Sequence, residues 1–203
     1  MTKYSQTFPL ARLRRNRQAP WIRALTAENT LSPADLIWSL IVHDGGEARQ
    51  PVPSMSGVDR LSPAEAAKAA KRAETLGIPA IAIFPNIDPA KKDANGSESL
   101  NKDGLIPTCI KAMKDAAPNV GIICDVALDP FTSHGHDGLI DEAGYVLNDE
   151  TTDMLVKQAL VQVEAGADVV APSDMMDGRI GAIRRALEEN GDTNALILSL
   201  IHI

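Results

Sequence analysis

Cysteine and aromatic residues are scarce in this sequence. Cys109 and Cys124 are the only cysteines among 203 residues, and they do not form a CxxC pair. Neither a disulfide framework nor a cysteine-based zinc site is therefore indicated. Aromatic residues make up only 3% of the chain, which argues against a surface that stacks nucleic-acid bases.

The chain also lacks an excess of positive charge and long apolar runs. Its formal net charge is -7, so the basic surface expected of a nucleic-acid-binding protein is missing. No run approaches the roughly eighteen apolar residues of a membrane-spanning helix, and the first residues contain no hydrophobic signal core. We predict a cytoplasmic protein without nucleic-acid or membrane partners.

The rest of the composition is that of a soluble globular protein, with 44% hydrophobic and 23% charged residues. Residues 1–30 show no clear periodicity, but they contain closely spaced arginines from Arg12 to Arg17, followed by Trp21. Two interpretations stay open for this segment. It is either a flexible basic tail or an arm that docks on another subunit through Trp21 and the arginines.

Apolar segments alternate with helix-forming segments over residues 31–203. We expect strands at 36–42, 78–84, 120–126, 167–171 and from 195, and helices at 66–76, 105–117, 151–164 and 180–189. This alternation predicts a parallel sheet with helices outside it. No Gly-rich phosphate-binding fingerprint follows the first strand, so an α/β TIM (β/α)8 barrel is favoured over a Rossmann fold.

Local signals mark several boundaries between these elements. Ser62 is expected to cap the first long helix, with Glu65 completing a capping box. Residues 51–57 are expected to form an extended loop, and Asn148 or Asp149 to cap the helix at 151–164. The polar segment 85–104 is long for a loop in a compact domain, which favours a functional or interface loop.

The stretch IICDVALDPFTSHGHDG, residues 122–138, places acidic and imidazole groups directly after a buried strand. It contains Asp125, Asp129 and Asp137, with His134 and His136 between the last two. Loops after strands carry the active sites of α/β enzymes. The alternative interpretation is a surface loop with solvated acids. We interpret the two histidines as structural hydrogen-bonding groups, because two imidazoles on one loop are weak evidence for a zinc site.

A second polar segment, VAPSDMMDGR, follows the fourth expected strand and includes Ser173 and Arg179. Because strand carboxyl ends meet at one end of a barrel, Ser173 to Asp177 are expected on the same side as Asp125. Two interpretations of Arg179 stay open. It either pairs with a nearby acid or simply begins a helix.

Five motifs together resemble one enzyme family. They are RLRRN from Arg12, SMSGVDRLS from Ser54, IAIFPNI from Ile81, CDVALDPFTSHGHDGL from Cys124 and VAPSDMMDGR from Val170. From the basic arm to about Leu198, the sequence resembles porphobilinogen synthase (5-aminolevulinate dehydratase). The resemblance implies a lyase that joins two 5-aminolevulinate molecules into porphobilinogen, with loss of water, in haem and other tetrapyrrole biosynthesis.

The same resemblance implies an architecture. The family fold is a TIM barrel whose N-terminal arm wraps around a neighbouring subunit, usually in a homo-octamer. This favours the arm interpretation of residues 1–30 and makes residues 31–203 a barrel truncated after about the fifth strand.

The resemblance also assigns roles to individual residues. Asp125 matches an active-site aspartate that orients the substrate, and Ser173 matches a residue that contacts the first-bound substrate. In zinc-dependent members, cysteines stand where this chain has Ala127, Asp129 and Asp137. Carboxylates suit harder ions than zinc, so the chain resembles the branch that uses Mg²⁺, sometimes with K⁺, and no catalytic zinc. Asp129 and Asp137 are tentative metal ligands.

The two Schiff-base lysines of the family are not found in this chain. Such a lysine must be neutral to condense with a ketone, which requires a lowered pKa. All the lysines fall in the arm, in expected helices or in the long polar loop: 3, 68, 71, 91, 92, 102, 111, 114 and 157. We therefore expect an inactive N-terminal portion of the enzyme, with residues 198–203 (LSLIHI) interpreted as a sequencing-library artefact.

Two further expectations concern the behaviour of such a chain. Open apolar strand edges predict poor solubility. The alternative function is a non-catalytic truncated subunit that binds intact protomers through its arm. A Schiff-base aldolase of another specificity would keep the barrel but would not explain the motifs at Cys124 and Val170.

Overall fold

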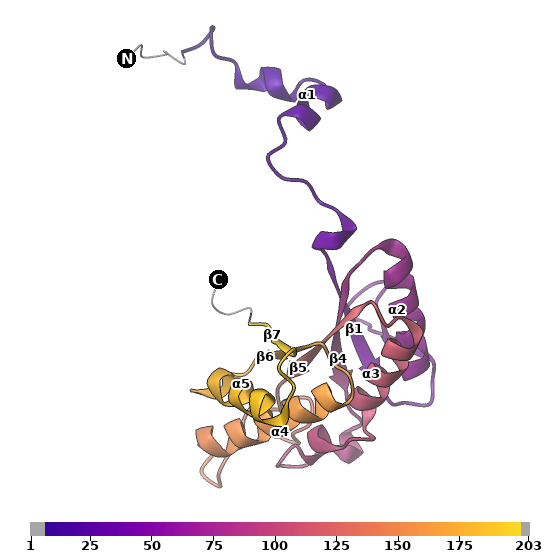
Figure 1. The fold of residues 1–203 in the computed structure, drawn as a ribbon, viewed down its shortest axis with the longest axis vertical. Coiled ribbons are helices and arrows are strands. Elements are labelled where there is room, and N and C mark those ends of the chain that lie inside the picture. Colours follow the sequence, from indigo (N-terminus) through magenta and orange to yellow (C-terminus); the bar gives the residue numbers. More distant parts are fainter. Residues whose placement is uncertain (1–6, 200–203) are drawn as a thin grey trace. The chain divides into compact units, whose positions relative to one another are not determined.

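The computed structural model describes residues 7–199. It divides into two compact units, Met1–Ser32 and Pro33–Ile203. The first unit contains the short 3-10 helix η1 (Leu13–Arg17) and helix α1 (Pro20–Leu25) (Figure 1). Neither helix buries a residue, and the Trp21 side chain is 67% exposed. The interpretation of this unit as an arm that wraps around another subunit stays a prediction.

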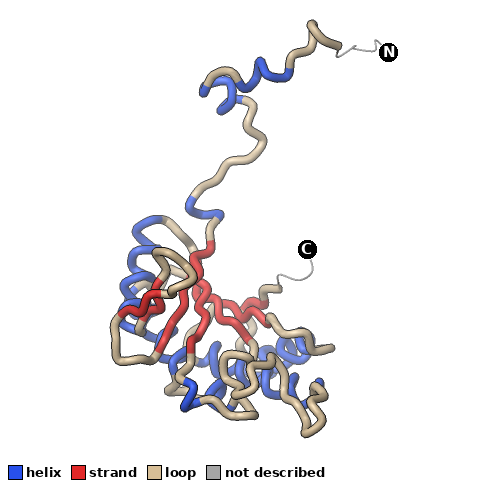
Figure 2. Tube along the Cα trace, turned by 180° about the vertical axis from the view of Figure 1, so that it is seen from behind, coloured by secondary structure: helices blue, strands red, loops and turns tan. Residues whose placement is uncertain are grey.

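The second unit is a seven-stranded sheet in the order β2-β3-β1-β4-β5-β6-β7. The sheet is drawn in red in Figure 2. Five strands run parallel in chain order: β1 (Ile37–His43), β4 (Ala80–Asn86), β5 (Gly121–Val126), β6 (Val169–Pro172) and β7 (Leu196–Ile197). The connecting helices are α2 (Pro63–Leu76), α3 (Leu105–Ala116), α4 (Asn148–Glu164) and α5 (Arg179–Asn190). The predicted alternation of strands and helices is confirmed, and this singly wound order is that of a (β/α)8 barrel.

The two faces of the parallel strands are buried to different extents. One face packs against the helices, and we call it the outer face; its residues include Val42, Ile83 and Ile122, each 0% exposed. These three residues belong to the cluster beneath α2 and α3, and a second cluster, with Val126 and Val170, lies beneath α4 and α5. The alternate residues form the inner face, which has no helix over it in the described part of the chain. The strictly alternating direction of strand side chains produces this division.

Two short strands flank the loop expected at 51–57, and only Pro51 of that segment lies in a strand. β2 (Arg49–Pro51) and β3 (Asp59–Leu61) form an antiparallel hairpin, and β3 pairs in parallel with β1. The backbone N–H of Val52 donates to the carbonyl of Val58 at 2.9 Å, which closes the hairpin. Strands of three residues are too short to show alternation, and the prolines at 51 and 53 concealed the strand pattern.

The helix caps differ in part from expectation. The Ser62 hydroxyl accepts a hydrogen bond from the Glu65 N–H at 3.4 Å, as a helix cap does. The Glu65 carboxylate does not return to Ser62, because it binds Arg49 and Lys68 instead. The prediction that Asn148 or Asp149 caps α4 is wrong, since the cap position is Leu147. Asn148 accepts a hydrogen bond from the Asp177 N–H at 2.8 Å and so ties α4 to the loop after β6.

The remaining short helices are all of the 3-10 type. They are η2 (Pro33–Asp35), η3 (Pro89–Lys91) and η4 (Ser97–Leu100), the last two within the long polar loop. Residues 198–203 were interpreted as an artefact. Leu198 donates its N–H to the Val170 carbonyl at 3.0 Å, and residues 200–203 lie outside the described residues. Among the described helices, none is long and apolar enough to cross a membrane.

Candidate functional site

The carboxyl ends of β5 and β6 bring Asp125 and Ser173 together. Ala171 of β6 is the register partner of Asp125, and Ser173 follows two residues later on the same face. The Ser173 hydroxyl donates to the Asp125 carboxylate at 2.6 Å. Both residues line a cavity of about 270 Å³ on the inner face, together with apolar side chains that include Phe84 and Ile123. The structure therefore joins two residues that the sequence placed 48 positions apart.

Burial of Asp125 beside apolar side chains raises the pKa of its carboxyl above the ordinary value. The hydrogen bond from Ser173 lowers the pKa, while the negative charges of Asp129 and Asp174 raise it further. The net direction is upward, so Asp125 holds a proton more readily than a solvated carboxylate does. Such a group can exchange a proton with a bound amine or carbonyl.

Two buried glutamines on α4 hold the backbone beside Asp125. The Gln162 side-chain N–H donates to the Asp125 carbonyl at 2.8 Å, and Gln158 donates to the Ala127 carbonyl at 3.1 Å. Their exposures are 2% and 1%. Sequence reasoning missed both residues. The sequence pattern could have indicated them, because residues four positions apart lie on one face of a helix and these two amides interrupt a face that is otherwise mainly apolar.

The predicted metal ligands lie close enough to influence one another. Partial burial raises the pKa of Asp129, the charge of Asp137 raises it further, and the charge of Lys92 opposes this. A cation would relieve the repulsion between the two carboxylates. Among residues 7–199, no group of three His, Cys, Asp or Glu side chains is placed to hold a metal ion. Two carboxylates, with water molecules as the remaining ligands, would suit Mg²⁺ better than zinc, because protein-bound Mg²⁺ usually keeps several of its waters.

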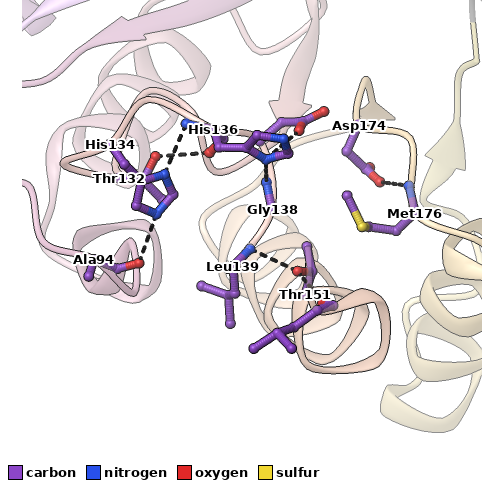
Figure 3. Close-up of polar contacts among 11 residues, drawn as sticks. Ala94, Thr132, His134, His136, Gly138, Leu139, Thr151, Asp174 and Met176 are labelled. Carbon is purple, nitrogen blue, oxygen red and sulfur yellow. Dashed lines mark hydrogen bonds and ion pairs between the residues drawn. The ribbon is translucent and has the colours of Figure 1, made fainter. Parts of the chain in front are cut away.

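The two histidines use their ring nitrogens inside the loop (Figure 3). His134 Nδ1 accepts from the His136 N–H at 3.1 Å, and His134 Nε2 lies 3.2 Å from the Ala94 carbonyl. His136 Nδ1 accepts from the Gly138 N–H at 2.9 Å. The Thr132 hydroxyl also donates to the His136 carbonyl at 2.9 Å. These bonds confirm the hydrogen-bonding interpretation and join the long polar loop to the acidic loop.

Comparison with known proteins places the chain in a family. The sequence pattern of the family "Delta-aminolevulinic acid dehydratase" matches residues 10–201. The chain belongs to this family. It is 52% identical over 188 residues to the Delta-aminolevulinic acid dehydratase of Bradyrhizobium diazoefficiens, covering 93% of this chain and 53% of that protein. It is 46% identical to the chloroplastic Delta-aminolevulinic acid dehydratase of Physcomitrium patens, covering 93% and 44%.

A solved structure of the dehydratase family confirms the fold. The crystal structure of delta-aminolevulinic acid dehydratase from Toxoplasma gondii ME49, in complex with the product porphobilinogen, matches with a TM-score of 0.88 and 47% identity. The match covers 93% of this chain and 54% of that chain. The prediction of a truncated TIM barrel is therefore confirmed. The chain spans about half the length of the curated relatives it matches.

In this dehydratase-family chain, a second buried acid lies next to the site. Asp174 is 0% exposed, and its carboxylate lies 2.9 Å from the Arg179 guanidinium. It also accepts a hydrogen bond from the Met176 N–H at 2.7 Å (Figure 3). Burial raises the pKa of Asp174, and although the Met176 N–H and Arg179 oppose that rise, the net direction is upward. Of the two interpretations of Arg179, pairing with an acid is the one observed, although the residue also begins α5.

Proposed function

We propose that this chain is the N-terminal portion of a porphobilinogen synthase. The activity is the condensation of two 5-aminolevulinate molecules to porphobilinogen with loss of water, in haem and other tetrapyrrole biosynthesis. The observation that carries the proposal is the hydrogen-bonded pair Asp125–Ser173 in a cavity at the strand carboxyl ends. Membership of the dehydratase family supplies the reaction class.

In this proposal Asp125 orients the substrate and its amino group, and Ser173 contacts the first-bound substrate. The raised pKa of Asp125 supports a role in proton exchange with that amine. None of the lysines in the described residues lies on the inner face of a strand. Catalysis therefore needs Schiff-base lysines that this chain does not supply.

We propose Mg²⁺, with K⁺ as a further ion, and no catalytic zinc. Asp129 and Asp137 are the candidate ligands, supported by the effect of the Asp137 charge on the pKa of Asp129 and by the preference of Mg²⁺ for carboxylate oxygens and water. If replacing both with asparagine in the complete protein left its metal dependence unchanged, this assignment would be wrong.

The proposed assembly is a homo-oligomer, an octamer by analogy with the family, located in the cytoplasm. The first unit supports an interface, because Phe8, Leu13 and Trp21 are 74%, 77% and 67% exposed. Large apolar side chains exposed beside several arginines are typical of a surface that another subunit covers. Plant relatives are described as chloroplastic, so the compartment is to be tested by cell fractionation.

The test begins with sequencing the locus through codon 203 and expressing the complete reading frame. Porphobilinogen formed from 5-aminolevulinate is then measured in the unaltered protein, in Asp125→Asn and in Asp153→Asn. Asp153 is exposed on α4 and serves as the matched control. We expect Asp125→Asn to lower kcat by about 100-fold or more, as removal of a proton-transfer group does, and Asp153→Asn to leave it unchanged. A complete protein that forms no porphobilinogen would overturn the proposal.

A further inference from the structure

The carboxyl end of β5 lacks one backbone hydrogen bond because β4 has a proline opposite it. At the start of this strand pair, the Gly121 N–H donates to the Pro79 carbonyl at 2.9 Å, and the register ends one residue before Asp125. Bonds of a parallel pair recur at every second residue, so residue 85 of β4 would donate the next N–H to the Asp125 carbonyl. Residue 85 is a proline, which has no N–H.

The side chain of Gln162 supplies the missing donor from α4. Its amide N–H donates to the Asp125 carbonyl at 2.8 Å. Gln162 is 2% exposed, and its amide oxygen is buried without a hydrogen-bond partner within residues 7–199. Burying an amide with an unmatched oxygen is unfavourable, so the bond to Asp125 offsets part of that cost.

This bond holds the backbone from which the Asp125 side chain projects. Asp125 is the last residue but one of β5, and its side chain points to the inner face, where the carboxylate accepts from Ser173 at 2.6 Å. A shift of the backbone at Asp125 would therefore move the carboxylate within the cavity. Misplacing a reacting group by about 1 Å can lower a rate about 100-fold.

From this geometry we infer that Gln162 is a positioning residue for Asp125 in the proposed synthase reaction. Its amide replaces the hydrogen bond that Pro85 cannot give, and it thereby sets the direction of the Asp125 carboxylate. Gln162 does not line the cavity, so it acts through Asp125 and not on the substrate. The inference rests on the proposed function, because it concerns how Asp125 serves that reaction.

The test compares variants of the complete protein in porphobilinogen formation. Gln162→Met has a side chain of similar length without a donor, and it should lower kcat about tenfold or more with little change in KM. Gln162→His places a ring N–H at a similar distance from the backbone and should recover most of the lost kcat. Lys157→Met changes an exposed residue of the same helix and should leave kcat unaltered.

Repeating the Gln162 substitution in Asp125→Asn distinguishes positioning from a general structural role. No carboxylate is left to direct in that background, so Gln162→Met should lower the remaining kcat only slightly. A residue that only stabilises the fold would lower kcat by the same factor in both backgrounds, as independent sites do.

Thermal melting tests the hydrogen bond without reference to the reaction. Pro85→Ala restores an N–H at residue 85, so it should raise the melting temperature more in Gln162→Met than in the unaltered protein, where the Asp125 carbonyl already has a donor. The double variant also provides a more stable form for assay if Gln162→Met alone does not stay folded.

The outcomes separate this inference from the proposed function. A complete protein that forms no porphobilinogen contradicts the proposed function. In a protein that does form it, three results would overturn the positioning role. They are an unchanged kcat in Gln162→Met, an equal loss of kcat with and without the Asp125 carboxylate, and an equal effect of Pro85→Ala on melting with and without the Gln162 amide.

Discussion

The outer and inner faces of the same five strands differ in what surrounds them. On the outer face, Val42, Ile83 and Ile122 are fully buried beneath helices. On the inner face, Ile37, Phe84 and Leu196 are 51%, 42% and 63% exposed. Both faces are rich in apolar residues, so hydrophobicity alone does not distinguish them. The outer face holds the fold together, and the inner face carries the candidate site.

Two buried acids, Asp174 and Asp125, differ in a similar way. Asp174 packs on the helix side and has an arginine partner. Asp125 lies on the inner face, and among residues 7–199 its one side-chain hydrogen-bond partner is the neutral hydroxyl of Ser173. Burial raises the pKa of both carboxyls, so the two acids differ in their partners: the charge of Arg179 can balance that of Asp174, whereas the hydroxyl of Ser173 cannot balance that of Asp125. The predictions below test this division.

The largest expected effect is at the Asp174–Arg179 pair. Arg179→Met leaves a buried carboxylate without its partner and should lower the free energy of unfolding by about 3–5 kcal/mol. Urea denaturation measures the change. Arg185→Met on the same helix removes an exposed arginine and should change stability by less than about 0.5 kcal/mol. Equal effects of the two substitutions would show that the pair does not support the loop after β6.

The next effect compares identical substitutions on the two faces. Ile122→Ala removes a fully buried side chain and should lower the free energy of unfolding by about 2–5 kcal/mol. Ile37→Ala removes a half-exposed one, so its effect should be below about 1 kcal/mol in the 203-residue chain. Urea denaturation of both variants gives the comparison. In a protein whose inner face is covered, Ile37→Ala should approach the effect of Ile122→Ala.

The sequence was informative wherever local pattern determines structure. Apolar runs predicted the five parallel strands, and the Ser62 signal predicted the start of α2. The β2–β3 hairpin was missed because its pairing with β1 is a non-local contact that three-residue strands do not signal. The cap of α4 was wrong because Asn148 makes a tertiary bond to Asp177, which competes with capping.

The candidate site was predictable only in part. Asp125 and Ser173 were identified by motif, and alternation along parallel strands explains why they meet. The support given by Gln158 and Gln162 depends on packing between α4 and the end of β5, and the Asp174–Arg179 pair depends on the burial of both side chains. Burial of a polar group is a tertiary property, so composition and spacing did not reveal it.

The smallest expected effect is at Asp125, where the substitution should increase the free energy of unfolding rather than lower it. The pKa of this carboxyl is raised above its ordinary value of 3.8, so the folded state binds a proton more tightly than the unfolded state does. Stability therefore falls as pH rises from the ordinary pKa through the raised one, and the loss is complete above both. Asp125→Asn removes the buried charge and should raise the free energy of unfolding at neutral pH by about 1 kcal/mol, within the range of other stabilising substitutions.

Urea denaturation of Asp125→Asn and the unaltered protein across a pH series measures this gain. The advantage of the variant should shrink as pH falls and vanish below the ordinary pKa, where the native carboxyl is also neutral. Ser173→Ala is the companion variant, because loss of the hydroxyl donor should raise the pKa of Asp125 further and move the transition to higher pH. A gain that does not depend on pH would mean that the charge of Asp125 is not its source. A true loss of stability in Asp125→Asn would instead show that this carboxylate, like Asp174, has a structural role.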